Sequence, residues 1–187
     1  MTQYHNIPPV YDKNSRILIL GSFPSVKSRE AQFFYGHPQN RFWKVMSAVL
    51  SCDLPVTVQQ KKLMLLSHNI AVWDVIGSCE ITGSSDATIS SVVPNDIAGL
   101  VAETSVTRIF ANGATSYNMY KRYCREISYP VAVTYGNITL LCVLYQMVKS
   151  YKYRLFFIDD CLDFFGVCFH IEKLTCLFKP ALKILQP

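Results

Sequence analysis

The stretch Arg16–Trp43, RILILGSFPSVKSREAQFFYGHPQNRFW, decides the fold of this chain. It opens with Ile17–Leu20, an uninterrupted apolar run of the length of a buried strand. Gly21 ends the run. Pro24 then favours a stiff turn, because its ring fixes its own φ and keeps Phe23 out of the α region. A stiff loop directly after a buried strand is typical of open α/β sheets, which hold their ligand sites at the carboxyl ends of the strands.

The second half of the stretch is rich in aromatic rings. The rings flank the polar segment GHPQNR of residues 36–41, and they are Phe33, Phe34, Tyr35, Phe42 and Trp43. The polar segment itself carries an imidazole, side-chain amides and a guanidinium. Flat apolar walls around a few hydrogen-bonding groups are typical of a ligand pocket, here one that suits a flat polar ring.

Strands and helices are expected to alternate along the chain. The strands are expected at 16–21, 70–73, 106–111 and 138–144, and the helices at 41–52, 56–69 and 114–125, with Thr57 and either Asn95 or Asp96 as helix caps. Phe42, Val45, Met46 and Val49 recur at helical spacing, which predicts that Phe42 belongs to the core. The alternation predicts an α/β fold with three layers, α/β/α, around a short, mostly parallel four-stranded sheet.

Three further segments complete the outline. Residues 1–15 are expected to form an extended lead-in, and residues 77–85 a long polar loop. Asp74, at the end of the second strand, is expected either to bond backbone amides or to take part in catalysis. The turn at Asn112 and Gly113 leads from a strand into a helix, so it is either an ordinary turn or a phosphate site.

Composition limits the class of protein. The chain has 187 residues, of which 50% are hydrophobic and 17% charged, so we expect a globular protein with one main core. A net charge of +5 permits a DNA partner but also fits a solvated basic surface. Seven cysteines without a CxxC pair indicate reduced thiols in a cytoplasmic protein without a metal cluster. We expect neither a signal peptide nor a membrane span.

GSFPS (21–25) followed by FFYGHPQNRFWKV (33–45) resembles the uracil-DNA glycosylase superfamily, and within it the hypoxanthine (deoxyinosine) DNA glycosylase branch. The pattern WDV…GS.D…ND of the middle third matches the same family. The mismatch-specific uracil/thymine glycosylases share HPxNRFWKV, but their strand-end loop reads GINPG and contains an asparagine, where this chain has Ser22. The resemblance extends from about Ser15 to Leu144.

The resemblance implies a monofunctional, monomeric DNA repair glycosylase without a cofactor. It would flip a deaminated base (hypoxanthine, or uracil or xanthine) out of DNA and hydrolyse its N-glycosidic bond. The implied catalytic residues are Asn40 and Ser22, the implied base-binding residues are Phe23, Tyr35, His37 and Asp74, and the implied DNA contacts are Pro24, Ser25, Arg41 and Asn112. For His37 a second role, shaping the HPQN turn, is equally open.

The last part of the chain departs from the family. We therefore expect a glycosylase-like domain at residues 1–144 and an atypical segment at residues 145–187. Family members carry a Pro/Ser-rich loop of the type LPSTSPAN after the last strand, and this chain reads YQMVKSYKYR at 145–154. Either a shifted reading frame or a divergent tail would explain this. Two alternatives to the enzyme stay open: a DNA-binding protein of the same fold with impaired catalysis, and a small-molecule enzyme that binds nucleotides. The small-molecule enzyme ranks last, because the chain lacks a glycine-rich phosphate fingerprint.

Overall fold

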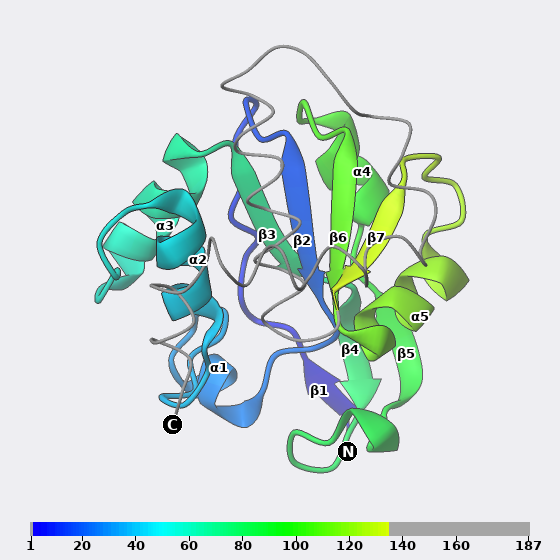
Figure 1. The fold of residues 1–187 in the computed structure, drawn as a ribbon. Helices are drawn as coiled ribbons and strands as arrows, with labels where there is room; N and C mark the ends of the chain where they lie inside the picture. The colour runs from blue at the N-terminus through cyan, green and yellow to red at the C-terminus, as the bar shows by residue number, and fades with distance from the viewer. Residues whose placement is uncertain (1, 135–187) are drawn as a thin grey trace, which may run out of the picture. The chain divides into compact units, whose positions relative to one another are not determined.

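Four parallel strands form the central sheet of the protein (Figure 1). The computed structural model describes residues 2–134, and the strands follow the order β3 (Ile70–Asp74), β2 (Ile17–Gly21), β6 (Arg108–Asn112) and β7 (Val131–Thr134). Gly21 lies opposite Asp74, and Asn112 lies opposite Thr134. Because the strands are parallel, their carboxyl ends meet at one edge of the sheet. The expected fold class and the placement of Gly21 and Asp74 at neighbouring strand ends are confirmed.

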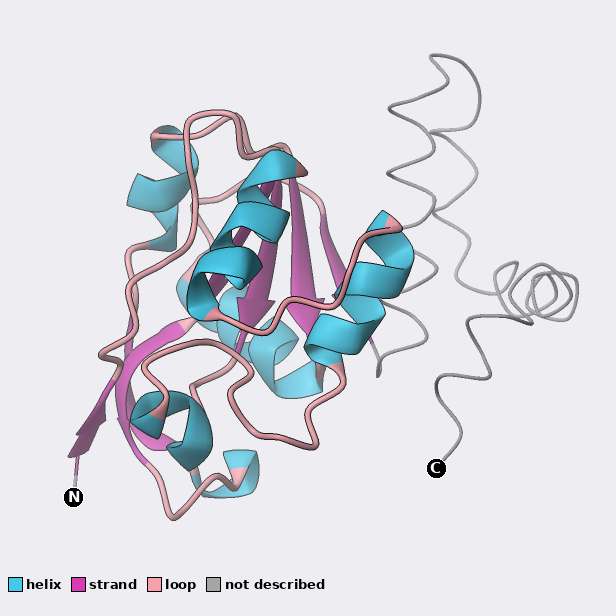
Figure 2. Cartoon of the chain, turned by 90° about the vertical axis from the view of Figure 1, so that its left-hand side faces the viewer, coloured by secondary structure: helices cyan, strands magenta, loops and turns pink. Residues whose placement is uncertain are grey.

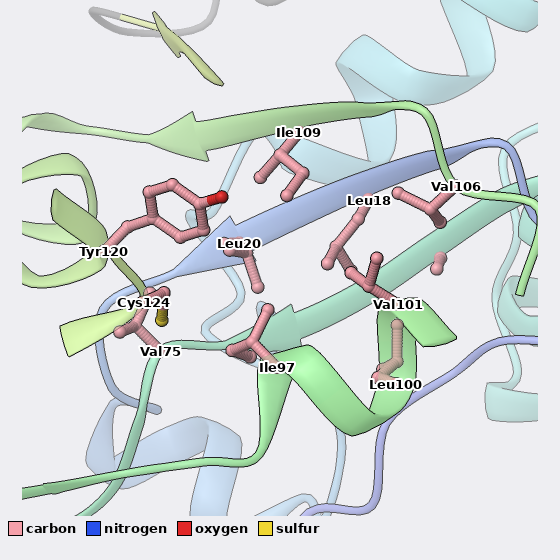
Figure 3. Close-up of a cluster of buried hydrophobic side chains, with 11 residues drawn as sticks. Leu18, Leu20, Val75, Ile97, Leu100, Val101, Val106, Ile109, Tyr120 and Cys124 are labelled. Atoms are coloured by element: carbon pink, nitrogen blue, oxygen red, sulfur yellow. The ribbon is translucent and has the colours of Figure 1, made fainter. Parts of the chain in front are cut away.

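The helices α4 (Ile97–Ala102) and α5 (Ala114–Tyr123) cover one face of this sheet. Leu18 and Leu20 of β2 point toward this face and pack with side chains of both helices, including Ile97 and Tyr120 (Figure 3). Both leucines are fully buried. Complete burial of one such side chain contributes about 1.5–3 kcal/mol. This cluster therefore determines which face of β2 points toward α4 and α5.

The other face of the sheet is covered by α2 (Phe42–Leu50) and α3 (Val58–Ser67), as Figure 1 shows. Seen from that side, helices lie in front of the strands (Figure 2). Successive strand residues point to opposite faces, so Ile17 and Ile19 face these helices. The stripe expected on α2 is confirmed, since Phe42, Val45, Met46 and Val49 are all buried.

A second sheet was not expected from the sequence. Its strands follow the order β1 (Thr2–Tyr4), β4 (Ile76–Glu80) and β5 (Ser90–Pro94), and neighbouring strands are antiparallel. A 3-10 turn at Asp86–Thr88 lies between β4 and β5. The expected long polar loop at 77–85 is therefore wrong over its first residues, which form β4, and the lead-in at 1–15 contains a paired strand. These strands are short and mix polar with apolar residues without regular alternation, so their pattern resembles that of loops.

Helix boundaries follow local chemistry. Thr57 begins α3 with a reciprocal cap, because its side chain accepts from Gln60 N–H while the Gln60 side chain accepts from Thr57 N–H. Asp96 begins α4 by accepting from Gly99 N–H at 2.8 Å. Both predicted caps are confirmed. The short helix α1 (Val26–Glu30), which follows the stiff turn, was not expected.

Several expectations concern residues outside the described range. The strand expected at 138–144, the domain boundary at residue 144 and the segment 145–187 all lie there. The fourth strand that the structure does describe is β7, in a Val-Ala-Val-Thr stretch that directly follows Pro130. Among the described residues, no helix has the length and apolar character needed to cross a membrane.

Candidate active site at the carboxyl ends of the parallel strands

Hydrogen bonds connect the ends of β6 and β7 with the aromatic segment. The Thr134 hydroxyl lies 3.2 Å from Asn112 Oδ1 and 3.3 Å from the carbonyl oxygen of Ala111. At its other end, Asn112 Nδ2–H donates to the hydroxyl oxygen of Tyr35 at 3.0 Å. Both ends of the Asn112 carboxamide are thus bound within the protein, and its expected contact with DNA stays a prediction.

Tyr35 is fixed at both its ring and its hydroxyl. Its ring stacks on Phe42, with 3.7 Å between the ring centroids and 16° between the planes. Its φ of 53° lies in the left-handed region, which costs a residue other than glycine about 1–2 kcal/mol. Burial raises the pKa of the Tyr35 phenol, and the Asp74 carboxylate raises it further, while the bond from Asn112 lowers it. Tyr35 is therefore a neutral phenol at physiological pH.

Asp74 is paired with a histidine from the amino-terminal segment. His5 Nε2 lies 2.8 Å from Asp74 Oδ2, and the side chains are 1% and 7% exposed. His5 Nδ1 accepts from the N–H of Ile7 at 3.4 Å, so a neutral imidazole carries its proton on Nε2 and donates it to the carboxylate. In place of the expected backbone amides, the carboxylate's partner among the described residues is an imidazole.

Gly21 makes room for this carboxylate. A β-carbon at position 21 would collide with Asp74 Oδ1 and would lie 3.7 Å from the Tyr35 hydroxyl oxygen. Oδ1 and the phenol therefore share a small space beside Gly21, at the carboxyl edge of the sheet. This space brings together Gly21 of β2, Asp74 of β3 and Tyr35, whose hydroxyl is bonded to Asn112 of β6.

The loop after β2 is attached to the loop between β4 and β5. Ser22 Oγ–H donates to Asp86 Oδ2 at 3.0 Å. The backbone N–H of Val26 donates to Ser84 Oγ, also at 3.0 Å. Ser22 was predicted from the sequence as a site residue, but no hydrogen-bond partner was predicted for it. The structure adds a carboxylate, Asp86, beside it.

Phe23, Pro24 and Ser25 have structural roles in the same loop. Phe23 is 8% exposed and packs with Cys79, and the guanidinium carbon of Arg29 lies 5.5 Å from the centre of its ring. Pro24 is buried, and the Ser25 side chain caps α1. The base contact expected of Phe23 and the DNA contacts expected of Pro24 and Ser25 stay predictions.

The segment GHPQN leads into α2, whose N-cap residue is Arg41. Asn40 Oδ1 accepts from Phe42 N–H at 2.8 Å, which holds its carboxamide at the start of α2, beside Arg41. His37 Nδ1 accepts from Gln39 N–H at 3.2 Å, and its carbonyl oxygen accepts from Asn40 N–H at 2.8 Å. The role of His37 in shaping this turn is confirmed. Because Nδ1 is an acceptor, a neutral His37 keeps a proton on Nε2, which makes that atom a donor.

The residues described above provide four kinds of polar group for chemistry. They are the carboxylate of Asp74, the neutral phenol of Tyr35, the imidazoles of His5 and His37, and the carboxamides of Asn40 and Asn112. Within residues 2–134, no group of three or more His, Cys, Asp or Glu side chains could hold a metal ion. The expectation that the protein uses no metal or cofactor stays a prediction. Two residues of the site were missed by sequence reasoning, His5 and Asp86. His5 carries no motif signal, whereas Asp86 belongs to the GS.D pattern that accompanied the family resemblance.

Comparison with known proteins agrees with this architecture. The sequence model of the uracil DNA glycosylase superfamily matches residues 8–160, which runs past the expected boundary at residue 144. A hypoxanthine DNA glycosylase from Methanosarcina acetivorans is 35% identical over 127 residues, which cover 67% of this chain and 80% of the relative. A second one, from Methanosarcina barkeri, is 40% identical over 83 residues, which cover 44% of this chain and 52% of the relative.

The fold comparison leads to the same group of proteins. A solution NMR structure from Methanosarcina acetivorans, assigned provisionally as a uracil DNA glycosylase, has a TM-score of 0.67 and 26% sequence identity to this chain. The aligned region covers 79% of this chain and 99% of that one. With a family match over most of its length, and with the parallel sheet and strand-end site described above, this chain belongs to the uracil DNA glycosylase superfamily.

Proposed function

We propose that this protein is a monofunctional DNA repair glycosylase that flips hypoxanthine out of DNA and hydrolyses its N-glycosidic bond, with uracil and xanthine as further substrates. The observation that carries the proposal is the polar site at the strand ends, formed by Asp74, Tyr35 and Asn112. Family membership supports a base-excision enzyme, and two relatives that bear the name hypoxanthine DNA glycosylase support the choice of base.

Asn40 is the proposed catalytic residue. Cleavage builds positive charge on the sugar and negative charge on the leaving base, and an amide can serve both without titrating near pH 7. The bond from Phe42 N–H uses one lone pair of Oδ1 and fixes the carboxamide. The second lone pair can orient the attacking water, while Nδ2–H can donate to the base. Removal of one such positioned group costs about 10²–10³ in rate.

Tyr35 is the proposed wall on which the extruded base stacks. Phe42 supports one face of its ring, and Asn112 holds its hydroxyl, so the ring needs little reordering when a base arrives. Base–aromatic stacking contributes about 1–3 kcal/mol, which offsets part of the cost of removing the base from the duplex. His37 Nε2–H is a proposed donor to a base carbonyl. Phe23 and Asp74 are proposed base contacts, with Ser22 beside the reacting centre.

DNA is the proposed macromolecular partner, held through Pro24, Ser25, Arg41 and Asn112. Arg41 is exposed and follows Asn40 in sequence, which supports a phosphate contact beside the proposed catalytic residue. We also propose a monomer that acts in the cytoplasm. The three described cysteines are all free thiols, which supports a reducing compartment. Light scattering of the purified protein measures the oligomeric state.

The test uses purified protein and duplexes that contain a single hypoxanthine, uracil or xanthine, with strand cleavage after alkali as the readout under single-turnover conditions. We expect the fastest cleavage at hypoxanthine and none at an undamaged duplex. Asn40→Ala removes both the amide and the acceptor for the Phe42 N–H at the start of α2, whereas Asn40→Ser keeps an oxygen that can accept this bond. A rate loss of about 10²–10³ in both variants assigns Asn40 to the chemistry. Unchanged cleavage by Asn40→Ser excludes that role.

One alternative function has an observation in its favour. The chain lacks the Pro/Ser-rich run after residue 144, so a protein of this fold that binds deaminated DNA with impaired catalysis is the second candidate. Binding without cleavage of any of the three duplexes would support this alternative over the enzyme.

A further inference from the structure

The pair formed by His5 and Asp74 is placed by the second sheet and enclosed by aromatic rings. His5 N–H donates to the carbonyl oxygen of Gly77 at 2.8 Å, which continues the pairing of β1 with β4. The imidazole centroid lies 6.1 Å from that of Phe23 and also 6.1 Å from that of Phe34. Backbone pairing and ring packing together therefore leave the imidazole little freedom to move.

The pairing gives the two carboxylate oxygens of Asp74 different roles. Oδ2 accepts from His5 Nε2–H at 2.8 Å. Oδ1 lies in the space beside Gly21, where the Tyr35 hydroxyl is also found. The hydrogen bonds described for residues 2–134 give Oδ1 no donor, although the Asp74 side chain is only 7% exposed. Oδ1 is not among the fully buried unpartnered atoms of the described residues, so an acceptor of this kind in a ligand site is suited to a donor on the ligand.

We propose that His5 is a positioning residue that holds Asp74 Oδ1 as the acceptor for the ring N–H of a deaminated base. This inference rests on the proposed function. Deamination turns the bare N1 of adenine into the N1–H of hypoxanthine, and the bare N3 of cytosine into the N3–H of uracil. A carboxylate only accepts hydrogen bonds, so Oδ1 attracts the deaminated base and repels the lone pair of the normal one.

The same contact explains why one site can take hypoxanthine, uracil and xanthine, which all carry a ring N–H beside a carbonyl. It does not distinguish guanine or thymine, which carry one as well. Those bases are disfavoured by the higher cost of extruding them from intact pairs. His5 contributes by fixing the side-chain rotamer of Asp74, because a carboxylate without its partner would turn away from Gly21 toward other donors.

The experiment compares hypoxanthine with unsubstituted purine, which has a bare N1, in otherwise identical duplexes. His5→Leu removes the donor to Oδ2, and His5→Gln keeps an N–H donor near the position of Nε2. We expect His5→Leu to lower kcat/KM for hypoxanthine by about tenfold to a hundredfold, the range for a hydrogen bond to a charged group, and to leave cleavage of purine nearly unchanged. His5→Gln should restore most of the loss.

An equal loss for both bases, or no loss for either, overturns the inference, since a purely structural role would affect both substrates alike. Asp74→Asn preserves the shape of the side chain and provides a second variant should His5→Leu fold poorly. Asp74→Asn is expected to lower kcat/KM for hypoxanthine and to raise it for purine, because the charge that repels the bare N1 is removed. Thermal melting of each variant confirms that the protein compared is folded.

A binding readout separates this inference from the proposed function. Fluorescence anisotropy measures affinity for duplexes that carry hypoxanthine or adenine at one position, with no need for cleavage. If the wild-type protein prefers hypoxanthine without cleaving it, and His5→Leu abolishes the preference, the proposed catalysis is wrong and the role of His5 stands. If the wild-type protein cleaves hypoxanthine and His5→Leu keeps the full preference, the role of His5 is wrong and the catalysis stands.

Discussion

Asn112 and Tyr35 are 77 residues apart in sequence, and the Asn112 carboxamide donates to the Tyr35 hydroxyl at 3.0 Å. This bond ties the end of β6 to the aromatic segment that follows β2. It also fixes the phenol oxygen near Asp74, while Phe42 fixes the ring. The two contacts can be separated by mutation, because one needs the hydroxyl and the other needs only the ring.

Tyr35→Phe is expected to keep the ring stack and to leave Asn112 Nδ2–H without its acceptor. A fully buried unsatisfied donor costs about 1–3 kcal/mol, and this pair is partly buried, so the free energy of unfolding should fall by up to about that amount in urea titrations. Tyr35→Leu also removes the stacking surface and should reduce the affinity for DNA with an extruded base by a further factor of about 5 to 150, which corresponds to about 1–3 kcal/mol. Equal affinities of the two variants would contradict the role of the ring.

Gly21→Ala is expected to displace the Asp74 carboxylate, because the new methyl group would occupy the position of Oδ1. Overpacking of this kind costs about 1–3 kcal/mol and should also lower the rate of base excision. Gly83→Ala is the matched control. Gly83 has a φ of +63° with nothing near its β-position, so only backbone strain of about 1 kcal/mol is expected, with normal excision. Urea denaturation and single-turnover cleavage measure the two effects.

Tyr120→Phe is expected to maintain or raise stability. The Tyr120 hydroxyl is buried in the cluster of Figure 3 and has no hydrogen-bond partner in the described part of the chain. Burial, followed by smaller contributions from Cys124 and Glu126, raises the pKa of this phenol to about 12. The folded protein thus holds the proton more tightly than the unfolded chain, whose phenol titrates near 10.

The sign of the pH effect follows from this difference. Between about pH 10 and pH 12 the folded state binds more protons, so the free energy of unfolding falls as the pH rises through that window. Urea titrations of the wild-type protein at pH 9, 10 and 11 should show the fall. Tyr120→Phe should show a smaller fall in the free energy of unfolding over the same pH range. Identical pH dependences of the two proteins would refute the assignment to Tyr120. The Cys124 thiol, whose pKa burial raises to about 11, accounts for part of what remains.

The region from residue 145 can be tested by replacement. A Leu-Pro-Ser-Thr-Ser-Pro-Ala-Asn segment introduced at position 144 would restore the phosphate-contacting loop that the family resemblance implies. Each added phosphate contact should steepen the dependence of log affinity on log salt by about 0.9, as measured by anisotropy from about 50 to 300 mM salt. An unchanged slope and an unchanged cleavage rate would mean that the native segment already makes these contacts.

Much of the fold could be predicted because local patterns encode it. The apolar run Ile17–Leu20 predicted β2, the helical stripe of Phe42 and Val45 predicted the buried face of α2, and Thr57 marked the start of α3. Each of these signals lies within a few residues of the feature that it determines.

The rest depends on pairing between distant residues. The hairpin of β4 and β5 was missed because its strands are short and mix polar with apolar residues, so alternation gives little signal. Asp74 was identified as a site residue, but its partner His5 is 69 residues away and lies in no motif. No local pattern could identify His5, since only the pairing of β1 with β4 brings it to the site.

The junction between the two sheets has a mechanical consequence. Val75 alone separates the last residue of β3 from the first residue of β4, and its N–H donates to the Gly21 carbonyl oxygen at 2.9 Å. The hairpin and the central sheet are therefore joined by a single residue that is itself hydrogen-bonded to β2. A displacement of the hairpin therefore reaches the backbone of Asp74 through one residue, so the position of this carboxylate depends on the second sheet as well as on the first.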